Sequence, residues 1–153
     1  MHRRNIPPLL AVAIALLLLV PSSAGADDHH ATAWAHGAHG GSYRLVGIPD
    51  GLGAHESRRG ATVFLNHELP AATTSEPDVG GPLNRGAFVS KYMLDRKGNV
   101  VSGERAYDTV FNENVLVGPA PEVGNATRPF SRFCSGSLAG PAHGFDRYIY
   151  LTN

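Results

Sequence analysis

Residues 87 to 102 read AFVSKYMLDRKGNVVS, and this stretch decides the fold class of the chain. Two runs of β-prone residues, 87–95 and 99–102, flank the triplet Arg96-Lys97-Gly98. Gly98 can adopt the positive φ that a tight loop requires, so we predict an antiparallel hairpin. Apolar side chains fall on both faces of its first strand, which predicts that neighbouring layers cover this strand on both sides.

Similar short runs continue in both directions from this hairpin. They occupy residues 43–48, 61–66, 106–111 and 148–152, and turn-rich triplets such as Pro49-Asp50-Gly51 separate them. No segment shows sustained helical periodicity. The sequence therefore predicts a mainly β fold built from antiparallel sheets. The segments 69–84 and 118–128 are rich in Pro, Thr, Gly and Ser, and we expect them to be long loops.

The first 26 residues have the pattern of a cleavable signal peptide. Arg3 and Arg4 precede the apolar run LLAVAIALLLLV at residues 9–20, and Ala24-Gly25-Ala26 offers the small residues that a signal peptidase accepts. A membrane span needs about 20 apolar residues, so this run is too short to be an anchor. We therefore expect a secreted protein, extracellular or periplasmic, with no membrane association after cleavage.

The rest of the chain is expected to form a flexible lead-in, rich in His, Gly and Ala, at residues 27–42 and one domain at residues 43–153. The chain has 13 Lys and Arg residues and 13 Asp and Glu residues. Loss of the leader removes two arginines and leaves a small negative charge, which argues against nucleic acid as a partner. Because a strongly β-prone run stands at the very end, we expect the N-terminal fragment of a longer protein.

Asn66-His67-Glu68 is the first candidate site, because it directly follows the apolar run at residues 62–65. In an extended strand the side chains of Asn66 and Glu68 point to the same side. An amide oxygen and a carboxylate placed in this way suit a hard cation such as calcium, whereas the imidazole of His67 suits a transition metal. The alternative is a polar junction between a strand and a loop, with solvated side chains.

Cys134 is the second candidate and the single cysteine of the chain, in the stretch FSRFCSGS at residues 130–137. It cannot form an internal disulfide, so it is a buried inert thiol, a metal ligand, or half of a bridge whose partner is absent from this sequence. Near the cationic Arg132 we expect a lowered thiol pKa, which favours a metal ligand or an anion-binding loop. The alternative is a small buried cysteine that packs beside phenylalanines.

Asp27-Asp28-His29 is the third candidate, because it would follow the cleavage site. A free amine with a histidine at the third position can enclose Cu(II) or Ni(II) in a square-planar set of nitrogen ligands. The alternative is a disordered polar tail.

Several blocks of this sequence resemble the secreted bacterial family related to the alkaline phosphatase PhoX. The blocks are VGIPDGLGA at residues 46–54, FLNHEL at 64–69, GAFVSK at 86–91, VVSG at 100–103 and FSRFCS at 130–135. They follow one another in order across the predicted domain. The last block is typical of an uncharacterised branch of relatives rather than of PhoX itself.

The resemblance implies a β-propeller, of which this chain would supply the first two to three blades. It also implies a calcium and iron cluster in the propeller channel, with Glu68 as the leading ligand. Asn66, His67 and Cys134 are further ligand candidates from their residue types, and Arg132 is a candidate for binding a phosphate ester substrate.

Two functions are consistent with this resemblance. The first is a metal-dependent phosphomonoesterase in the full-length protein, inactive as this fragment. The alternative is a non-enzymatic extracellular β-propeller that binds metal or a protein partner through its loops.

Overall fold

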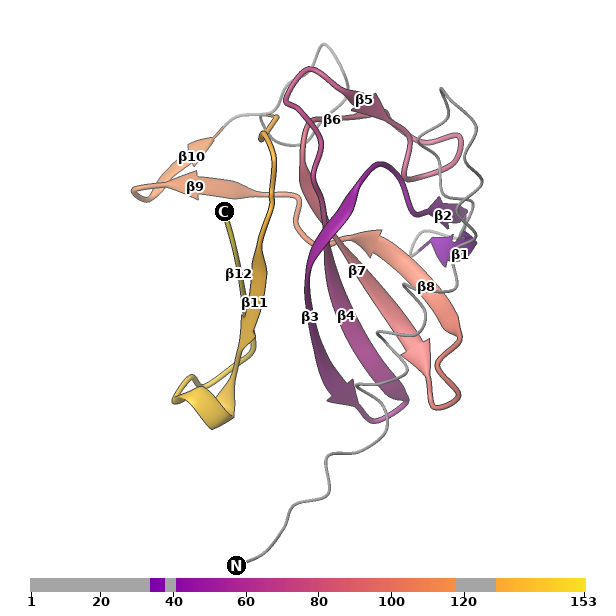
Figure 1. The fold of residues 1–153 in the computed structure, drawn as a ribbon, viewed down its shortest axis with the longest axis vertical. Coiled ribbons are helices and arrows are strands. Elements are labelled where there is room, and N and C mark those ends of the chain that lie inside the picture. Colours follow the sequence, from indigo (N-terminus) through magenta and orange to yellow (C-terminus); the bar gives the residue numbers. More distant parts are fainter. Residues whose placement is uncertain (1–33, 38–40, 118–128) are drawn as a thin grey trace, which may run out of the picture.

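The structure is a computed structural model, and it describes residues 34–37, 41–117 and 129–153 (Figure 1). The chain forms strands β1 (Trp34–Gly37), β2 (Ser42–Arg44), β3 (Pro49–Ser57), β4 (Gly60–His67), β5 (Thr74–Ser75), β6 (Asn84–Arg85), β7 (Phe88–Asp95), β8 (Val100–Arg105), β9 (Val110–Asn112), β10 (Val115–Val117), β11 (Gly136–Ala139) and β12 (Ile149–Thr152), and a short 3-10 helix, η2 (Pro141–His143). This part of the chain has no α-helix and no helix of the length and apolar character needed to cross a membrane. The predicted signal peptide and the predicted copper site at Asp27, Asp28 and His29 lie outside the described residues.

Six strands form one sheet in the order β2-β1-β8-β7-β4-β3. Neighbouring strands are antiparallel except β1 and β8, which are parallel. The pairs β9–β10, β11–β12 and β5–β6 form two-stranded sheets, and within the described ranges no sheet closes on itself. The prediction of a mainly β fold with antiparallel sheets is confirmed. β1 lies within the predicted lead-in, so the lead-in is not irregular throughout.

The hairpin predicted from residues 87–102 is confirmed as the pair β7–β8. Gly98 has a φ of 86°, and Asp95 Oδ1 accepts hydrogen bonds from the amides of Lys97 and Asn99. These amides lie in the turn, so the Asp95 carboxylate stabilises the loop together with the left-handed glycine.

The sequence predicts a turn at Pro49-Asp50-Gly51, and this prediction is wrong. The three residues open β3, whose register against β4 shifts between Pro49 and Leu52. A bulge of this kind accommodates turn-prone residues inside a strand. The predicted strand at residues 106–111 is also shorter than expected, because only its last two residues belong to β9.

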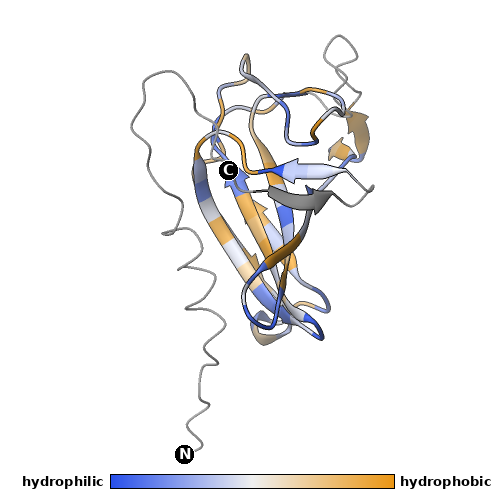
Figure 2. Ribbon diagram, turned by 90° about the vertical axis from the view of Figure 1, so that its right-hand side faces the viewer, coloured by the Kyte–Doolittle hydropathy of each residue, from blue (hydrophilic) through white to orange (hydrophobic). Residues whose placement is uncertain are grey.

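One face of the six-stranded sheet carries the main core. The core consists of alternate residues of β4 and β7 together with the chain around β2: Tyr43, Leu45, Ala61, Val63, Leu65, Tyr92 and Leu94, all buried. A second cluster of Val46, Leu69 and Phe88 extends it toward the end of β4. Figure 2 shows hydrophobic residues along the central strands of the sheet.

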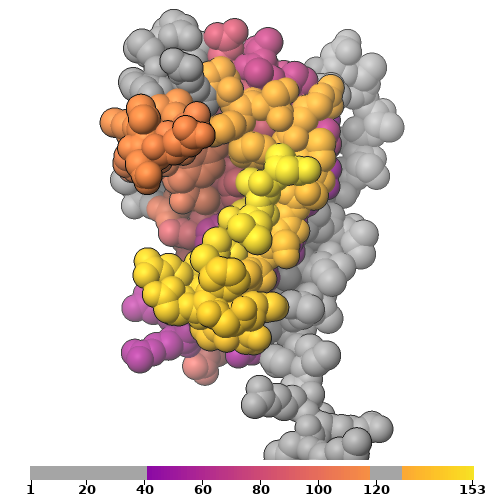
Figure 3. All heavy atoms as spheres, turned by 90° about the vertical axis from the view of Figure 1, so that its left-hand side faces the viewer, coloured from indigo at the N-terminus to yellow at the C-terminus, as the bar shows by residue number. Residues whose placement is uncertain are grey.

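The β11–β12 hairpin packs on the opposite face and forms an outer layer (Figure 3). A Cβ at Gly51 would lie 2.2 Å from the backbone nitrogen of Gly136, so the two strands approach at a pair of glycines. Tyr150 of β12 stacks on Phe64 of β4 with 5.4 Å between the ring centroids. The hairpin therefore covers β3 and β4.

β7 is buried throughout on the core face but only in part on the hairpin face. Val89 is buried there, whereas Lys91 and Met93 are half-buried. The prediction that neighbouring layers cover this strand on both sides is therefore correct for only part of its length.

Candidate functional site

The residues at the end of β4 point in alternate directions, as extended geometry requires. Asn66 and Glu68 both contact the segment that leads into β11, as the strand alternation predicts. His67 lies between them and points into the core on the other face. Asn66 and Glu68 therefore lie on the side of the hairpin, whereas His67 lies in the core.

Asn66 ties β4 to the β11–β12 hairpin. The residue is fully buried, and its Nδ2 donates to Ser135 O at 2.8 Å and to Thr152 Oγ1 at 2.9 Å. Its Oδ1 lies 3.0 Å from the Tyr150 hydroxyl. That hydroxyl also lies 2.8 Å from Gly51 O and can donate to one of the two oxygens at a time. The amide oxygen predicted as a cation ligand thus faces a hydroxyl donor, and Asn66 bridges two layers.

His67 is fully buried and hydrogen-bonded at both ring nitrogens. Val46 O lies 2.5 Å from Nδ1, and because a carbonyl only accepts, Nδ1 carries the proton. Nε2 then accepts from Ser90 Oγ at 2.7 Å, which in turn accepts from the Tyr43 hydroxyl at 2.7 Å. Burial, opposed by the bond to Val46, lowers the pKa of His67 to about 4. In this arrangement His67 packs the core, and the predicted role as a transition-metal ligand does not fit it.

Glu68 and Cys134 meet although 66 positions separate them in the sequence. The Cys134 thiol donates to Glu68 Oε1, with 3.0 Å between sulfur and oxygen. A guanidinium nitrogen of Arg132 lies 3.3 Å from the same oxygen. The side chain of Glu68 is 19% exposed and that of Arg132 is 58% exposed, so the carboxylate is sheltered whereas the guanidinium is in contact with solvent.

The hydrogen bond between the thiol and the carboxylate shifts the pKa values of the two groups in opposite directions. The hydrogen bond from Cys134 is the largest cause that lowers the pKa of Glu68, and Arg132 lowers it further. The same bond raises the pKa of the Cys134 thiol. The sequence predicts a lowered thiol pKa from Arg132 alone, and this prediction is wrong because the Glu68 carboxylate outweighs the guanidinium. At neutral pH the pair is a carboxylate and a neutral thiol with one proton between them.

Asp50 is a residue of this site that sequence reasoning missed. Its side chain lies near enough to Glu68 to contribute to the lowered pKa of that carboxyl, and its charge helps to raise the pKa of Cys134. The bulge that opens β3 places Asp50 beside the end of β4, because Pro49 pairs with His67. A strand assignment from residue 49 onward would have found it.

Glu68 and Cys134 form a pair rather than a complete metal site. Among the described residues, no group of three or more His, Cys, Asp and Glu side chains is arranged to hold a metal ion. In comparisons with known proteins, the chain matches no family model, no curated protein and no solved structure.

Proposed function

We propose that this chain belongs to a secreted PhoX-like β-propeller and that Glu68 and Cys134 are two ligands of its metal centre, with calcium and iron as the metals. By the same resemblance, we propose a phosphomonoester as the substrate of the full-length protein. The observation that carries the proposal is the contact between Cys134 Sγ and Glu68 Oε1 at 3.0 Å.

The separation of these two atoms fits a shared metal ion. Zinc, taken as the reference for a first-row metal such as iron, binds thiolate sulfur at about 2.3 Å and carboxylate oxygen at about 2.1 Å. Where two such bonds meet at a right angle, the ligand atoms lie about 3.1 Å apart. Cys134 and Glu68 therefore need little movement to bind one ion. Because the ion replaces the thiol proton, binding should strengthen as pH rises.

The layering of the strands supports the propeller part of the proposal. In a propeller, successive antiparallel sheets pack around a central channel. Here the four neighbouring strands β8, β7, β4 and β3 form one antiparallel unit, and the β11–β12 hairpin begins a second layer on it. The stacked rings of His55 and Tyr148, 4.0 Å apart, and of Phe64 and Tyr150 join the two layers. Two consecutive blades would be arranged in this way.

Arg132 has the chemistry for the phosphate of the substrate. A guanidinium matches phosphate oxygens in geometry and charge. Arg132 has a φ of 55°, which is uncommon for a residue other than glycine, and such residues cluster at functional sites. Once a cation neutralises Glu68, the exposed guanidinium is free to turn toward a phosphate oxygen.

Metal binding by the 153-residue chain tests the proposal. Equilibrium dialysis against calcium or iron, followed by elemental analysis, should show metal bound to the unaltered chain. Glu68→Gln should weaken binding of both metals, and Cys134→Ser should weaken binding of iron, each by about tenfold or more, because calcium takes oxygen ligands only. Glu56→Gln is the matched control, because Glu56 is an exposed residue near the far end of β3. Equal binding by all four proteins would overturn the proposal.

A phosphatase assay separates this proposal from the non-enzymatic alternative. The protein expressed from its complete reading frame is tested for hydrolysis of 4-nitrophenyl phosphate with calcium and iron added. Metal-dependent hydrolysis that Glu68→Gln abolishes supports the phosphomonoesterase. Metal binding without hydrolysis supports a propeller that binds metal or a protein partner.

A further inference from the structure

The β3–β4 turn and the β7–β8 turn lie side by side at one end of the six-stranded sheet (Figure 1). The tip of the first turn is Arg58-Arg59, and the tip of the second is Arg96-Lys97. Arg96 Nη2 donates a hydrogen bond to Arg58 O at 3.3 Å, so the two tips are in contact. All four residues are exposed, and none forms an ion pair with another described residue. These four residues are called the basic end below.

The geometry of the two turns does not require cations at their tips. Tight hairpin turns are most often built from Gly, Asn and Asp. In the β7–β8 turn, Gly98 and the Asp95 carboxylate already stabilise the loop, so positions 96 and 97 are open to many residue types. Each tip nevertheless carries two cations, which points to contact with an anionic partner.

The acidic residues of this region leave an excess of positive charge at the basic end. The Asp95 carboxylate accepts hydrogen bonds from turn amides, and Asp146 forms an ion pair with Arg147. Glu56 is a further exposed carboxylate near the first turn. The composition does not indicate this local excess, because the chain has 13 Lys and Arg residues and 13 Asp and Glu residues. Folding gathers the cations from turns that are 38 positions apart.

A third segment reaches the same end of the molecule. The loop between β11 and β12, which contains η2, lies level with the two turns (Figure 1, Figure 3). In this loop the side chains of Phe145 and Tyr148 are 42% and 49% exposed. The Tyr148 ring stacks on His55, near the end of β3 that leads into the first turn. This end of the molecule therefore presents cations and aromatic rings on three separate segments.

We propose that the basic end and the loop with Phe145 dock together on the surface of a bilayer that contains anionic phospholipids. A planar partner can contact three segments at once, cations bind anionic headgroups, and aromatic side chains favour the membrane interface. The sequence predicts no membrane association after cleavage, because its apolar run is too short and its net charge is small. Surface docking requires neither a span nor a high net charge, because the local arrangement of charges supplies the attraction.

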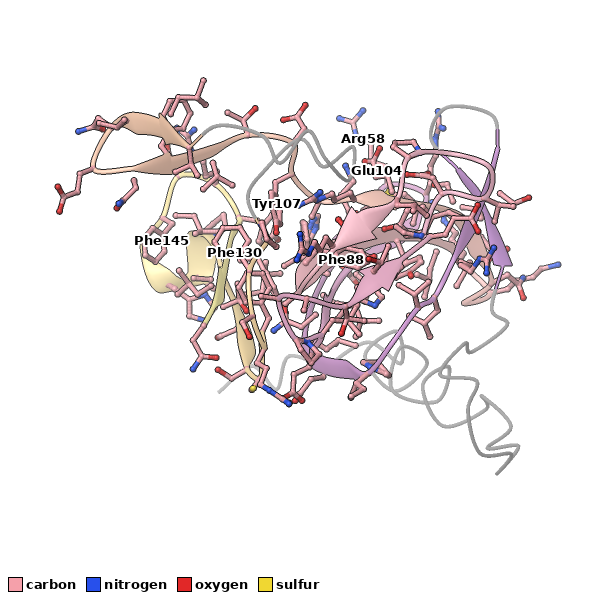
Figure 4. All side chains as sticks on the ribbon, turned by 90° about the horizontal axis from the view of Figure 1, so that it is seen from above. Arg58, Phe88, Glu104, Tyr107, Phe130 and Phe145 are labelled. Carbon is pink, nitrogen blue, oxygen red and sulfur yellow. The ribbon has the colours of Figure 1, made fainter. Side chains whose placement is uncertain are left out.

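The docked chain would hold the candidate metal centre away from the membrane. β4 begins at Gly60 beside the two turns and ends at His67 beside Glu68, and its 8 residues rise by about 25 Å. Figure 4 looks along the strands from the end at which β4 terminates, so Arg58 lies at the far end of that view. A soluble substrate would still reach Glu68 in the docked chain. The inference goes beyond the proposed function and does not depend on it.

Co-sedimentation with lipid vesicles tests the proposal, with the protein expressed with its own leader and purified from the exported fraction. One set of vesicles is pure phosphatidylcholine, and the other contains about one third phosphatidylglycerol. We expect binding to the second set at low salt and binding at least about tenfold weaker to the first. Binding should be lost as salt rises to about 0.5 M, because salt screens exposed charges. Equal binding to both sets of vesicles would overturn the proposal.

Two arginine variants locate the docking surface. Arg59→Gln and Arg132→Gln each remove one positive charge from an exposed residue, at opposite ends of β4. Arg59→Gln should weaken binding to the anionic vesicles by about fivefold, whereas Arg132→Gln should leave it unchanged. Equal binding by the two variants would overturn the proposal.

Two apolar variants distinguish a bilayer from a soluble polyanion such as polyphosphate. Phe145 lies beside the basic end, whereas Val115, which is 68% exposed, lies in β10 away from it (Figure 1). Phe145→Ser should weaken vesicle binding by about threefold, and Val115→Ser should leave it unchanged, because only Phe145 would bury apolar surface at the interface. Equal vesicle binding by the two variants would overturn the bilayer as the partner. Binding to polyphosphate without binding to vesicles would overturn it in favour of a soluble polyanion.

Discussion

The two faces of the six-stranded sheet are held by different kinds of contact. On the core face, alternate residues of neighbouring strands are buried together, and the hydrogen-bonded series Tyr43, Ser90 and His67 runs through them. On the hairpin face, the contact between Gly51 and Gly136, the amide of Asn66 and two stacked ring pairs hold a layer that lies 69 or more positions away in the sequence. The core face is closed, and the hairpin face is half open.

This difference separates stability from the candidate functions. The titratable groups Tyr43 and His67 of the core face are fully buried, whereas the Glu68–Cys134 pair depends on the position of the β11–β12 hairpin. If the hairpin is displaced, this pair should separate while the core remains folded.

The core face should lose stability in mild acid because of His67. Its pKa is about 4 in the folded state and about 6.5 in the unfolded chain, so the unfolded chain binds the proton first. The free energy of unfolding should be insensitive to His67 above pH 6.5. It should fall by about 3 kcal/mol as pH drops from about 6.5 to about 4. Urea denaturation at a series of pH values measures this slope.

A pair of histidine variants assigns the slope to His67. His67→Gln does not titrate, so its stability, although lower at neutral pH, should depend much less on pH in this interval. His143→Gln, in the exposed helix η2, should keep the full slope. The same slope in both variants would contradict the assignment.

Gly51→Ala should displace the hairpin and cost about 2 kcal/mol of unfolding free energy. The added Cβ would lie 2.2 Å from Gly136 N and 2.4 Å from Ser135 C, and these backbone atoms cannot rotate away. Gly41→Ala is the control, because nothing lies within 4 Å of its Cβ. Denaturation monitored by near-ultraviolet circular dichroism compares the two variants, and equal stability would show that the glycine contact does not hold the hairpin.

Tyr150→Phe should have the smallest effect of the three, a loss of about 1 kcal/mol. It removes the hydroxyl that lies between Gly51 O and Asn66 Oδ1, while the ring that stacks on Phe64 remains. Tyr148→Phe removes a hydroxyl from a half-exposed side chain, and its ring still stacks on His55. The midpoint temperature of thermal unfolding should be lower for Tyr150→Phe than for Tyr148→Phe. The reverse order would contradict the role of the Tyr150 hydroxyl.

The sequence predicted those parts of the fold that depend on near neighbours. The β7–β8 hairpin was predictable because alternating side chains and the turn with Gly98 are local signals. The start of β3 was not, because Pro49-Asp50-Gly51 has the composition of a turn. Its strand conformation depends on the register with β4 and on the close approach of Gly136 to Gly51.

In the candidate site, too, the features set by near neighbours were predictable and the contacts between distant residues were not. Strand alternation predicted that Asn66 and Glu68 would lie on one side. It could not predict that Thr152, 86 positions away, would engage the Asn66 amide, or that Cys134 would meet Glu68. The pKa of Cys134 is raised because its thiol contacts Glu68. The neighbouring sequence does not indicate this, because the charged residue nearest to Cys134 in it is the cationic Arg132.

The visible absorption spectrum of the chain loaded with iron(III) shows whether Cys134 is a ligand of the metal centre. A thiolate bound to iron(III) gives a charge-transfer band in the visible range, because the soft sulfur donates electron density to the metal. We expect this band for the unaltered chain, a weaker or shifted band for Glu68→Gln, and no band for Cys134→Ser. A spectrum that is the same in the unaltered chain and in Cys134→Ser would contradict this expectation.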